Sequence, residues 1–125
     1  MKIDRFEDII AWQKAKEFTV LIYGAFGTLK DFGFRDQIRR ASVSIMNNIA
    51  EGFERKTDKE FLHSLYVAKG SAAEVRSMLQ LAGELNYLEP HEFSELEEKS
   101  LEISRILSGL IKSLYRKPGP PMSTV

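Results

Sequence analysis

Hydrophobic residues recur along this chain at alternating steps of three and four, which is the spacing of the buried side of an α-helix. The first stripe consists of Ala11, Ala15, Phe18, Ile22, Ala25 and Leu29. Asp4 and Glu7 stand three residues apart just before this stripe, in the arrangement of a helix-capping pair. The pattern therefore predicts a first helix from about Phe6 to Leu29.

A second stripe follows the break at "KDFGF" and predicts a helix from about Phe34 to Glu54. Its core side on a helical wheel consists of Ile38, Ala41, Ile45, Ile49, Gly52 and Phe53. A third helix is expected to begin at the capping box of Thr57 and Glu60 and to end near Asn86. The third stripe consists of Phe61, Leu65, Ala68, Ala72, Val75, Leu79 and Ala82.

Pro90 suits the first turn of a fourth helix, because the missing N–H of proline costs no hydrogen bond there. The fourth stripe consists of Leu96, Ile103, Leu107, Leu110 and Leu114. No segment shows the alternation of a β-strand. Long helices with short connections predict an all-α fold, an up-down-up-down antiparallel four-helix bundle over residues 1–117. The tail at residues 118–125, "PGPPMSTV", is expected to be disordered.

The outward side of the second helix carries small and amide side chains where a solvated helix usually carries Lys and Glu. This side consists of Arg40, Val43, Ser44, Asn47, Ala50 and Glu51. Small side chains permit close packing and amides can pair with a partner, so we predict that these residues form a subunit interface. An alternative remains open: Asn47 and Asn48 cover a kink and bond locally to the backbone.

The composition is that of a folded globular domain, with 43% hydrophobic and 29% charged residues among 125. Lys and Arg together number 18, as do Asp and Glu, so no overall basic excess indicates a nucleic-acid-binding protein. The absence of cysteine excludes disulfides and zinc–thiolate sites and agrees with a cytoplasmic location. We recognise neither a signal peptide nor a membrane span and expect no membrane partner.

One pattern resembles an enzyme site: Glu60 and His63 form the Glu-x-x-His element of di-iron bundles. Such a site needs this element on two helices, and the other histidine, His91, has no glutamate three residues before it. No Ser/His/Asp grouping and no phosphate-binding glycine loop is recognisable. We therefore predict no catalytic residues, no metal, no cofactor and no enzymatic activity.

Basic residues offer a candidate contact with nucleic acid. They are Arg35, Arg39, Arg55, Lys56 and Lys59, which could form a ridge along the second helix, with Phe53 or Tyr66 nearby for stacking. The alternative is ordinary solvated charge, balanced by Asp36, Glu51, Glu54 and Asp58. An oligomer would repeat even a modest patch around its symmetry axis.

Three segments resemble the four-helix-bundle proteins of the 23S ribosomal RNA intervening-sequence family. They are "FEDIIAWQKA", "DQIRRASVSIMNNIAEGFERK" and "EFLHSLYVAKGSAAEVRSMLQLA", within a resemblance that covers roughly residues 5–115. The residues that match the family motif are Arg39, Arg40, Ser44, Asn48, Glu51 and Gly52. The resemblance implies a bacterial protein that assembles as a ring-shaped homopentamer and has no known catalytic residues.

A relative of that family, the accessory protein of diversity-generating retroelements, binds nucleic acid and a reverse transcriptase, but it is strongly basic. We therefore expect a non-enzymatic oligomer that is an RNA-, nucleic-acid- or protein-binding accessory. The alternative is a purely structural or protein-partner module without affinity for nucleic acid, which the neutral net charge favours.

Overall fold

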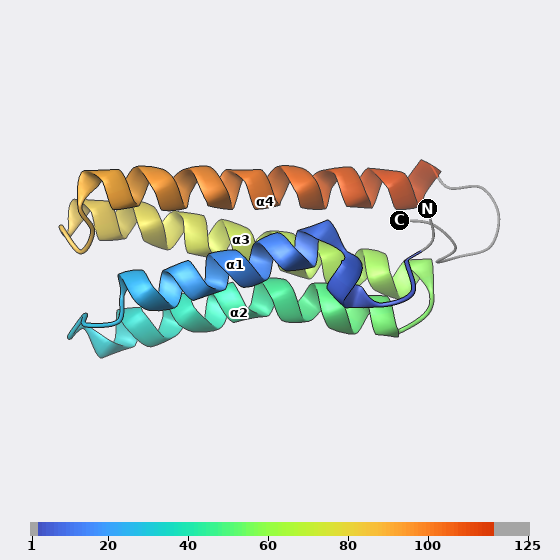
Figure 1. Ribbon diagram of the computed structural model, residues 1–125, viewed down its shortest axis with the longest axis horizontal. Helices are drawn as coiled ribbons and strands as arrows, with labels where there is room; N and C mark the ends of the chain where they lie inside the picture. The colour runs from blue at the N-terminus through green and yellow to red at the C-terminus, as the bar shows by residue number, and fades with distance from the viewer. Residues whose placement is uncertain (1–2, 117–125) are drawn as a thin grey trace.

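Four long helices run alternately up and down, in a computed structural model that describes residues 3–116 (Figure 1). The 3₁₀ turn η1 spans Phe6–Asp8, and the helices are α1 (Ile10–Ala25), α2 (Phe32–Glu54), α3 (Asp58–Glu84) and α4 (Pro90–Arg116). No strand occurs within residues 3–116. The predicted all-α antiparallel four-helix bundle is confirmed. The predicted disordered tail at 118–125 lies outside the described residues.

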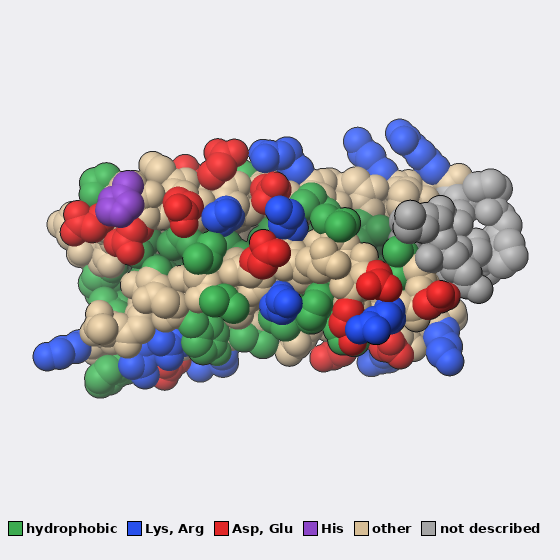
Figure 2. All heavy atoms as spheres, in the orientation of Figure 1, with side chains coloured by type: hydrophobic (Ala, Val, Ile, Leu, Met, Phe, Trp, Pro, Cys, Tyr) green, Lys and Arg blue, Asp and Glu red, His purple; other side chains and the backbone are tan. Residues whose placement is uncertain are grey.

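Helix α1 is much shorter than its neighbour α4, with 16 residues against 27. The two helices leave hollows between them, lined by Val20 and Leu21 of α1 and by Leu96 and Ile103 of α4. Figure 2 shows hydrophobic side chains exposed along the middle of this face, between charged side chains of both signs. The α1–α4 side is therefore the most open side of the bundle.

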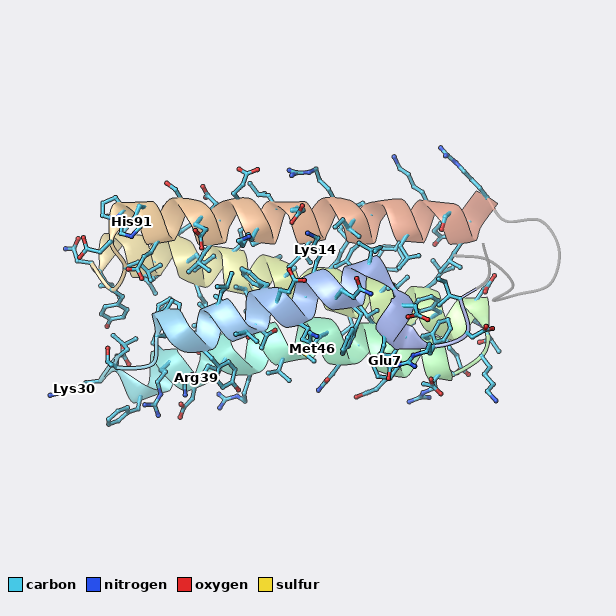
Figure 3. The ribbon with its side chains drawn as sticks, in the orientation of Figure 1. Glu7, Lys14, Lys30, Arg39, Met46 and His91 are labelled. Atoms are coloured by element: carbon cyan, nitrogen blue, oxygen red, sulfur yellow. The ribbon has the colours of Figure 1, made fainter. Side chains whose placement is uncertain are left out.

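The predicted start of the first helix is wrong. Residues Phe6–Asp8 form η1, and Ile9 is extended (φ −78°, ψ 122°), so α1 begins only at Ile10. The Glu7 side chain pairs with Arg5 (3.4 Å) and does not form the predicted cap with Asp4. The physical reason is packing: Phe6 sets its ring edge-on to Trp12 at 5.1 Å, which requires the chain to turn before α1. Figure 3 shows Glu7 at this turn.

The other helix ends follow from recognisable capping residues. The Thr57 hydroxyl accepts the backbone N–H of Glu60 at 3.2 Å, as the sequence predicts for the start of α3. Pro90 is the first residue of α4, also as predicted. In contrast, α2 begins two residues earlier than predicted, because Asp31 is its cap and accepts the N–H of Phe34.

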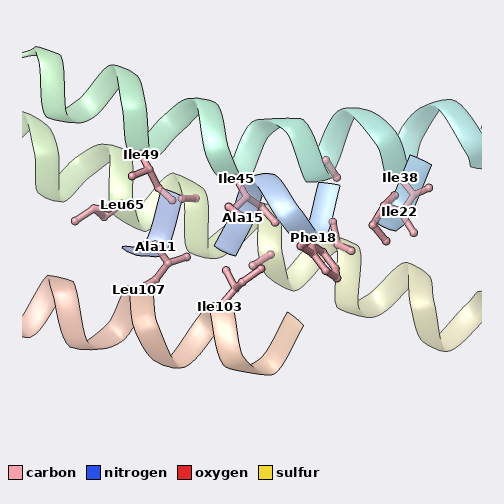
Figure 4. Close-up of a cluster of buried hydrophobic side chains, with 14 of the residues drawn as sticks. Ala11, Ala15, Phe18, Ile22, Ile38, Ile45, Ile49, Leu65, Ile103 and Leu107 are labelled. Atoms are coloured by element: carbon pink, nitrogen blue, oxygen red, sulfur yellow. The ribbon is translucent and has the colours of Figure 1, made fainter. Parts of the chain in front are cut away.

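The core lies along the bundle axis and is built from the predicted stripes. Figure 4 shows one layer of it, where Ala15 of α1, Ile45 of α2 and Ile103 of α4 point toward one another. Every predicted core residue of α2 and α3 is buried. The fourth stripe differs at one position, where Ile111 is buried and Leu110 only partly so. Burial of these stripes is the main stabilising contribution to the bundle.

Candidate functional site

The small polar residues of α2 divide between a contact inside the chain and an exposed surface. Ser44 is half-buried, and its hydroxyl lies 2.8 Å from the hydroxyl of Ser71 on α3. The Asn48 amide donates to the Ser44 carbonyl at 2.9 Å and to its hydroxyl at 3.1 Å. Gly52 is so close to α3 that an added Cβ would lie 2.5 Å from Ser64 Cβ. These residues bring α2 and α3 into close contact.

The remaining residues of the predicted interface form an outward strip on α2, called here the α2 strip: Arg40, Val43, Asn47, Ala50 and Glu51. Arg40, Asn47 and Glu51 are exposed, and Val43 and Ala50 are half-buried. Ser44 points away from this strip into the contact with α3. The alternative expectation of local backbone bonding is confirmed for Asn48, whereas α2 continues without interruption from Phe32 to Glu54.

The predicted basic ridge is divided between the two ends of α2. Arg35 and Arg39 lie near its start, whereas Arg55, Lys56 and Lys59 lie around its end and the start of α3. Twenty residues of helix separate Arg35 from Arg55, which corresponds to about 30 Å at 1.5 Å per residue. The five side chains therefore form two separate basic groups.

The first group is organised by exposed aromatic rings. The Arg39 guanidinium lies 4.6 Å from the centre of the Tyr23 ring, and the Arg35 guanidinium lies 4.7 Å from the centre of the Phe32 ring. Tyr23 is 42% exposed and Phe32 is 58% exposed. We call these four residues the arginine–aromatic cluster. Figure 3 shows Arg39 and Lys30 toward the same end of the bundle, where α1 turns into α2.

Hydrogen bonds hold the two arginines of this cluster in place. Arg39 Nη2 donates to the Tyr23 carbonyl at 3.4 Å, and Arg35 Nε donates to the half-buried Asp36 carboxylate at 3.1 Å. Arg39 Nε is buried and has no partner among the described residues. A guanidinium that stacks on a ring keeps its remaining N–H groups free for an anion.

The second group surrounds a hollow at the α2–α3 turn. Arg55 and Lys59 line this hollow together with Glu60, His63 and Ser64. Lys56 is in the left-handed backbone region (φ 70°) and is exposed. The expectation that Phe53 stacks on a base is wrong, because Phe53 is only 8% exposed and packs against the core residue Phe61.

The described residues offer little for metal chemistry. Glu60 and His63 are both exposed, and residues 3–116 contain no group of three or more His, Cys, Asp or Glu side chains placed to hold a metal ion. Within the same residues, no helix is long and apolar enough to cross a membrane.

Sequence reasoning missed the aromatic partners of the basic groups. Tyr23 and Phe32 lie off the predicted apolar stripes and are exposed. An aromatic residue off the stripe is the signal that could have identified them. The pairing of Tyr23 with Arg39 depends on how α1 and α2 are aligned, which the spacing within either helix does not give.

Comparison with known proteins identifies a protein family and a similar solved structure. The family model described as "23S rRNA-intervening sequence protein" matches residues 7–109. A crystal structure of a protein of unknown function from the S23 ribosomal protein family, from Bacteroides thetaiotaomicron, is similar with a TM-score of 0.77 and 28% identity. The similarity covers 82% of this chain and 99% of that one. No protein with a curated description matches the sequence.

Proposed function

The chain belongs to the 23S rRNA-intervening sequence protein family, and from this membership we propose that it is a non-enzymatic, oligomeric bundle that binds RNA as an accessory protein. The family description names ribosomal RNA, and RNA is the partner that the exposed basic and aromatic side chains fit best. An RNA partner places the protein in the cytoplasm.

The arginine–aromatic cluster is the observation that carries this proposal. Arg35 and Arg39 are each held over an exposed ring, so their guanidinium groups are ordered at the surface before any ligand binds. An ordered guanidinium binds a phosphate with less loss of side-chain entropy than a freely moving lysine. The exposed rings of Tyr23 and Phe32 provide a surface against which bases of an unpaired region can lie.

The neutral net charge does not oppose this proposal, because local charge decides phosphate binding. Lys30 and Arg40 lie in sequence close to the cluster and are exposed. The only neighbouring carboxylate paired with a cluster arginine is that of Asp36, among the residues that the structure describes. An oligomer would repeat the cluster in every subunit and so multiply the number of phosphate-binding groups.

We propose a homopentamer for the assembly, with the α2 strip as the subunit interface. The strip has the three-and-four spacing of a helix-packing surface, and its half-buried members Val43 and Ala50 are small and apolar. In a ring of five the strip meets a different surface of the next subunit, and Arg40 and Glu51, which carry opposite charges at its two ends, can pair with charges there. The Ser44 hydroxyl, in contrast, is already bonded to Ser71.

Fluorescence anisotropy with a structured RNA, across a series of salt concentrations, tests RNA binding. We expect affinity to fall as salt rises, because phosphate contacts release counterions. The double variant Arg35→Gln/Arg39→Gln should bind RNA more weakly. The dependence of its affinity on salt should also be shallower, by the equivalent of about two phosphate contacts. Lys99→Gln, in the acidic half of α4, removes one charge elsewhere and should bind as the parent protein does.

Light scattering tests the assembly. We expect a mass near five subunits for the parent protein. Asn47→Leu and Arg40→Glu should change that mass while helix content by circular dichroism stays the same. An unchanged mass in both variants means that the subunits meet elsewhere, for example along the open α1–α4 side.

A second candidate function is a structural or protein-partner module without affinity for nucleic acid. The equal numbers of basic and acidic residues, 18 of each, favour it. If the protein binds no RNA at 50 mM salt, this function is selected over the first.

A further inference from the structure

Two tyrosines from distant parts of the chain lie together on the outside of the bundle. Tyr66 of α3 and Tyr115 of α4 have their hydroxyl oxygens 3.4 Å apart, although 49 positions separate them in the sequence. Tyr66 is 49% exposed and Tyr115 is 66% exposed, so much of each ring contacts solvent. Exposed aromatic rings in pairs are uncommon on a surface unless they serve a contact.

The two helix segments that carry this pair are basic and contain no Asp or Glu. They are residues 61–73 of α3 and 103–116 of α4, and they carry the cations Lys69, Lys112 and Arg116, besides Arg105, which pairs with Glu98 at 3.8 Å. The nearest carboxylates along the two helices are Glu60, Glu74 and Glu102. Figure 2 shows Lys and Arg side chains projecting from the last turns of α4 without acidic neighbours in this view. A protein with zero net charge therefore separates its charges locally.

The antiparallel register places two of these cations beside the tyrosines. Tyr66 lies opposite Tyr115, and Arg76 donates to Ser104 at 3.3 Å. Because the helices are antiparallel, each step forward along α3 corresponds to one step backward along α4. Lys69 is therefore level with Lys112, one turn from the tyrosine pair. Positions three apart on a helix are about 5 to 6 Å apart at Cβ, within reach of adjacent phosphates.

The surface beyond these lysines is low and open. Gly70 and Gly109 lie at nearly the same level on the two helices, and a Cβ added at either would meet nothing within 4 Å. Tyr66 is an uncharged phenol at physiological pH and does not repel phosphate, and the hydrogen bond with Tyr115 raises its pKa further from the ordinary 10.0.

We propose that the α3–α4 surface of Tyr66, Lys69, Lys112, Tyr115 and Arg116 is a stacking platform for single-stranded RNA. The rings bind the faces of unpaired bases, and the cations bind the phosphates on either side. A duplex hides its base faces, so the platform discriminates against it. This inference rests on the proposed function, because it names the form of RNA that the protein binds and a surface distinct from the arginine–aromatic cluster.

The two tyrosines also join α3 to α4 through their hydroxyls. The test must therefore separate a structural role in helix packing from stacking on RNA bases. Replacement by phenylalanine removes the contact between the hydroxyls and keeps both rings. Replacement by serine removes the rings. Arg76–Ser104 and the hydrogen bond from Gln80 to Glu97 still join the two helices in either variant.

The experiment compares dye-labelled oligonucleotides by anisotropy: a 12-nucleotide single-stranded RNA, the same sequence as a blunt RNA duplex and as single-stranded DNA, and polyphosphate as a competitor without bases. We expect the single strand to bind tighter than the duplex. Tyr66→Ser/Tyr115→Ser should lose about tenfold or more for the single strand and little for the duplex. Tyr66→Phe/Tyr115→Phe should bind as the parent protein does. Lys69→Gln/Lys112→Gln should weaken binding and reduce its salt slope.

Each contrary outcome has a distinct meaning. If the serine variant, folded by circular dichroism, binds the single strand as tightly as the parent protein, the platform is wrong while RNA binding stands. Polyphosphate that competes as well as RNA, equally in the parent and serine proteins, overturns stacking in favour of general anion binding. If the parent protein binds no oligonucleotide at low salt, the proposed function itself fails. Equal affinity for RNA and DNA single strands supports the platform and assigns it no selectivity for the 2′-hydroxyl.

Discussion

The Tyr87 hydroxyl donates a hydrogen bond to Asp31 Oδ2, with 2.7 Å between the two oxygens. Asp31 precedes α2 and Tyr87 follows α3, so this bond joins the α1–α2 turn to the α3–α4 turn at one end of the bundle. Asp31 Oδ1 also accepts the Phe34 N–H, and the Tyr87 ring lies edge-on to Phe34 at 5.3 Å. One carboxylate therefore caps a helix and fastens two turns.

This contact predicts how stability depends on pH. The hydrogen bond from Tyr87, followed by that from the Phe34 N–H, lowers the pKa of Asp31. The ionised Asp31 carboxylate stabilises the fold fully above its ordinary pKa of 3.8, and this stabilisation is lost as pH falls through the lowered pKa of the folded protein. The hydrogen bond to Asp31 raises the pKa of Tyr87 above 10.0. The protonated Tyr87 phenol therefore stabilises the fold fully below pH 10, and this stabilisation is lost as pH rises through the raised pKa.

Thermal melting of the parent protein and of Tyr87→Phe across pH measures this effect. The variant should melt lower from about pH 5 to pH 9. The difference between the two melting temperatures should shrink toward strong acid, where Asp31 is protonated in the parent protein. A difference that persists unchanged at the lowest pH at which both proteins fold would show that the Tyr87–Asp31 bond is not its source.

Gly52 and Gly70 predict opposite effects of the same substitution. An added Cβ at Gly52 would lie 2.5 Å from Ser64 Cβ and 3.2 Å from Phe61 Cδ1. Ser64 Cβ is attached to the α3 backbone and cannot rotate away, so Gly52→Ala must push the helices apart. We expect a loss of about 1 to 3 kcal/mol in the free energy of unfolding, measured by urea denaturation.

Gly70→Ala is the matched control, because the new Cβ meets nothing within 4 Å. Alanine is the better helix former, so this variant should gain up to about 1 kcal/mol. Stabilisation by both substitutions would mean that α2 and α3 are farther apart in solution than in this structure.

The serine pair between α2 and α3 predicts coupling between two substitutions. Ser44→Ala leaves the half-buried Ser71 hydroxyl and the Asn48 amide without one partner, at a cost of about 1 kcal/mol. Ser71→Ala likewise leaves the Ser44 hydroxyl without its partner on α3. The double variant should cost less than the sum of the single variants, as a double-mutant cycle in urea measures. Strict additivity would contradict a direct bond.

Thr57 predicts the contribution of a helix cap. Its hydroxyl accepts the Glu60 N–H at the start of α3, so Thr57→Ala should lower the free energy of unfolding by about 1 kcal/mol. Thr28 lies exposed in the turn after α1, and Thr28→Ala should change the free energy of unfolding by less than about 0.5 kcal/mol. Equal effects of the two substitutions would argue against capping by Thr57.

Local sequence predicted the features that depend on neighbours within one helix. The stripe of α3, from Phe61 to Ala82, is buried throughout, because a period of 3.6 residues places its members on one side whatever the partner is. The Thr57 cap and the Pro90 start were also predicted correctly, since each depends on bonds within a single turn. The same reasoning failed at Phe6, where the chain follows a ring contact with Trp12.

The surfaces, in contrast, depend on contacts between helices. A helical wheel shows Ser44 opposite the core, yet α3 approaches α2 so closely at Gly52 that Ser44 meets Ser71.

The sequence by itself determined four amphipathic helices, their approximate ends and their buried sides, because these follow from short-range periodicity and capping. Only the tertiary structure decided which residues meet across helices: Arg39 with Tyr23, Tyr66 with Tyr115 and Asp31 with Tyr87. The physical reason is register. A shift of one turn between two antiparallel helices would leave every apolar stripe buried and bring different polar side chains together, so only the packed helices specify these pairs.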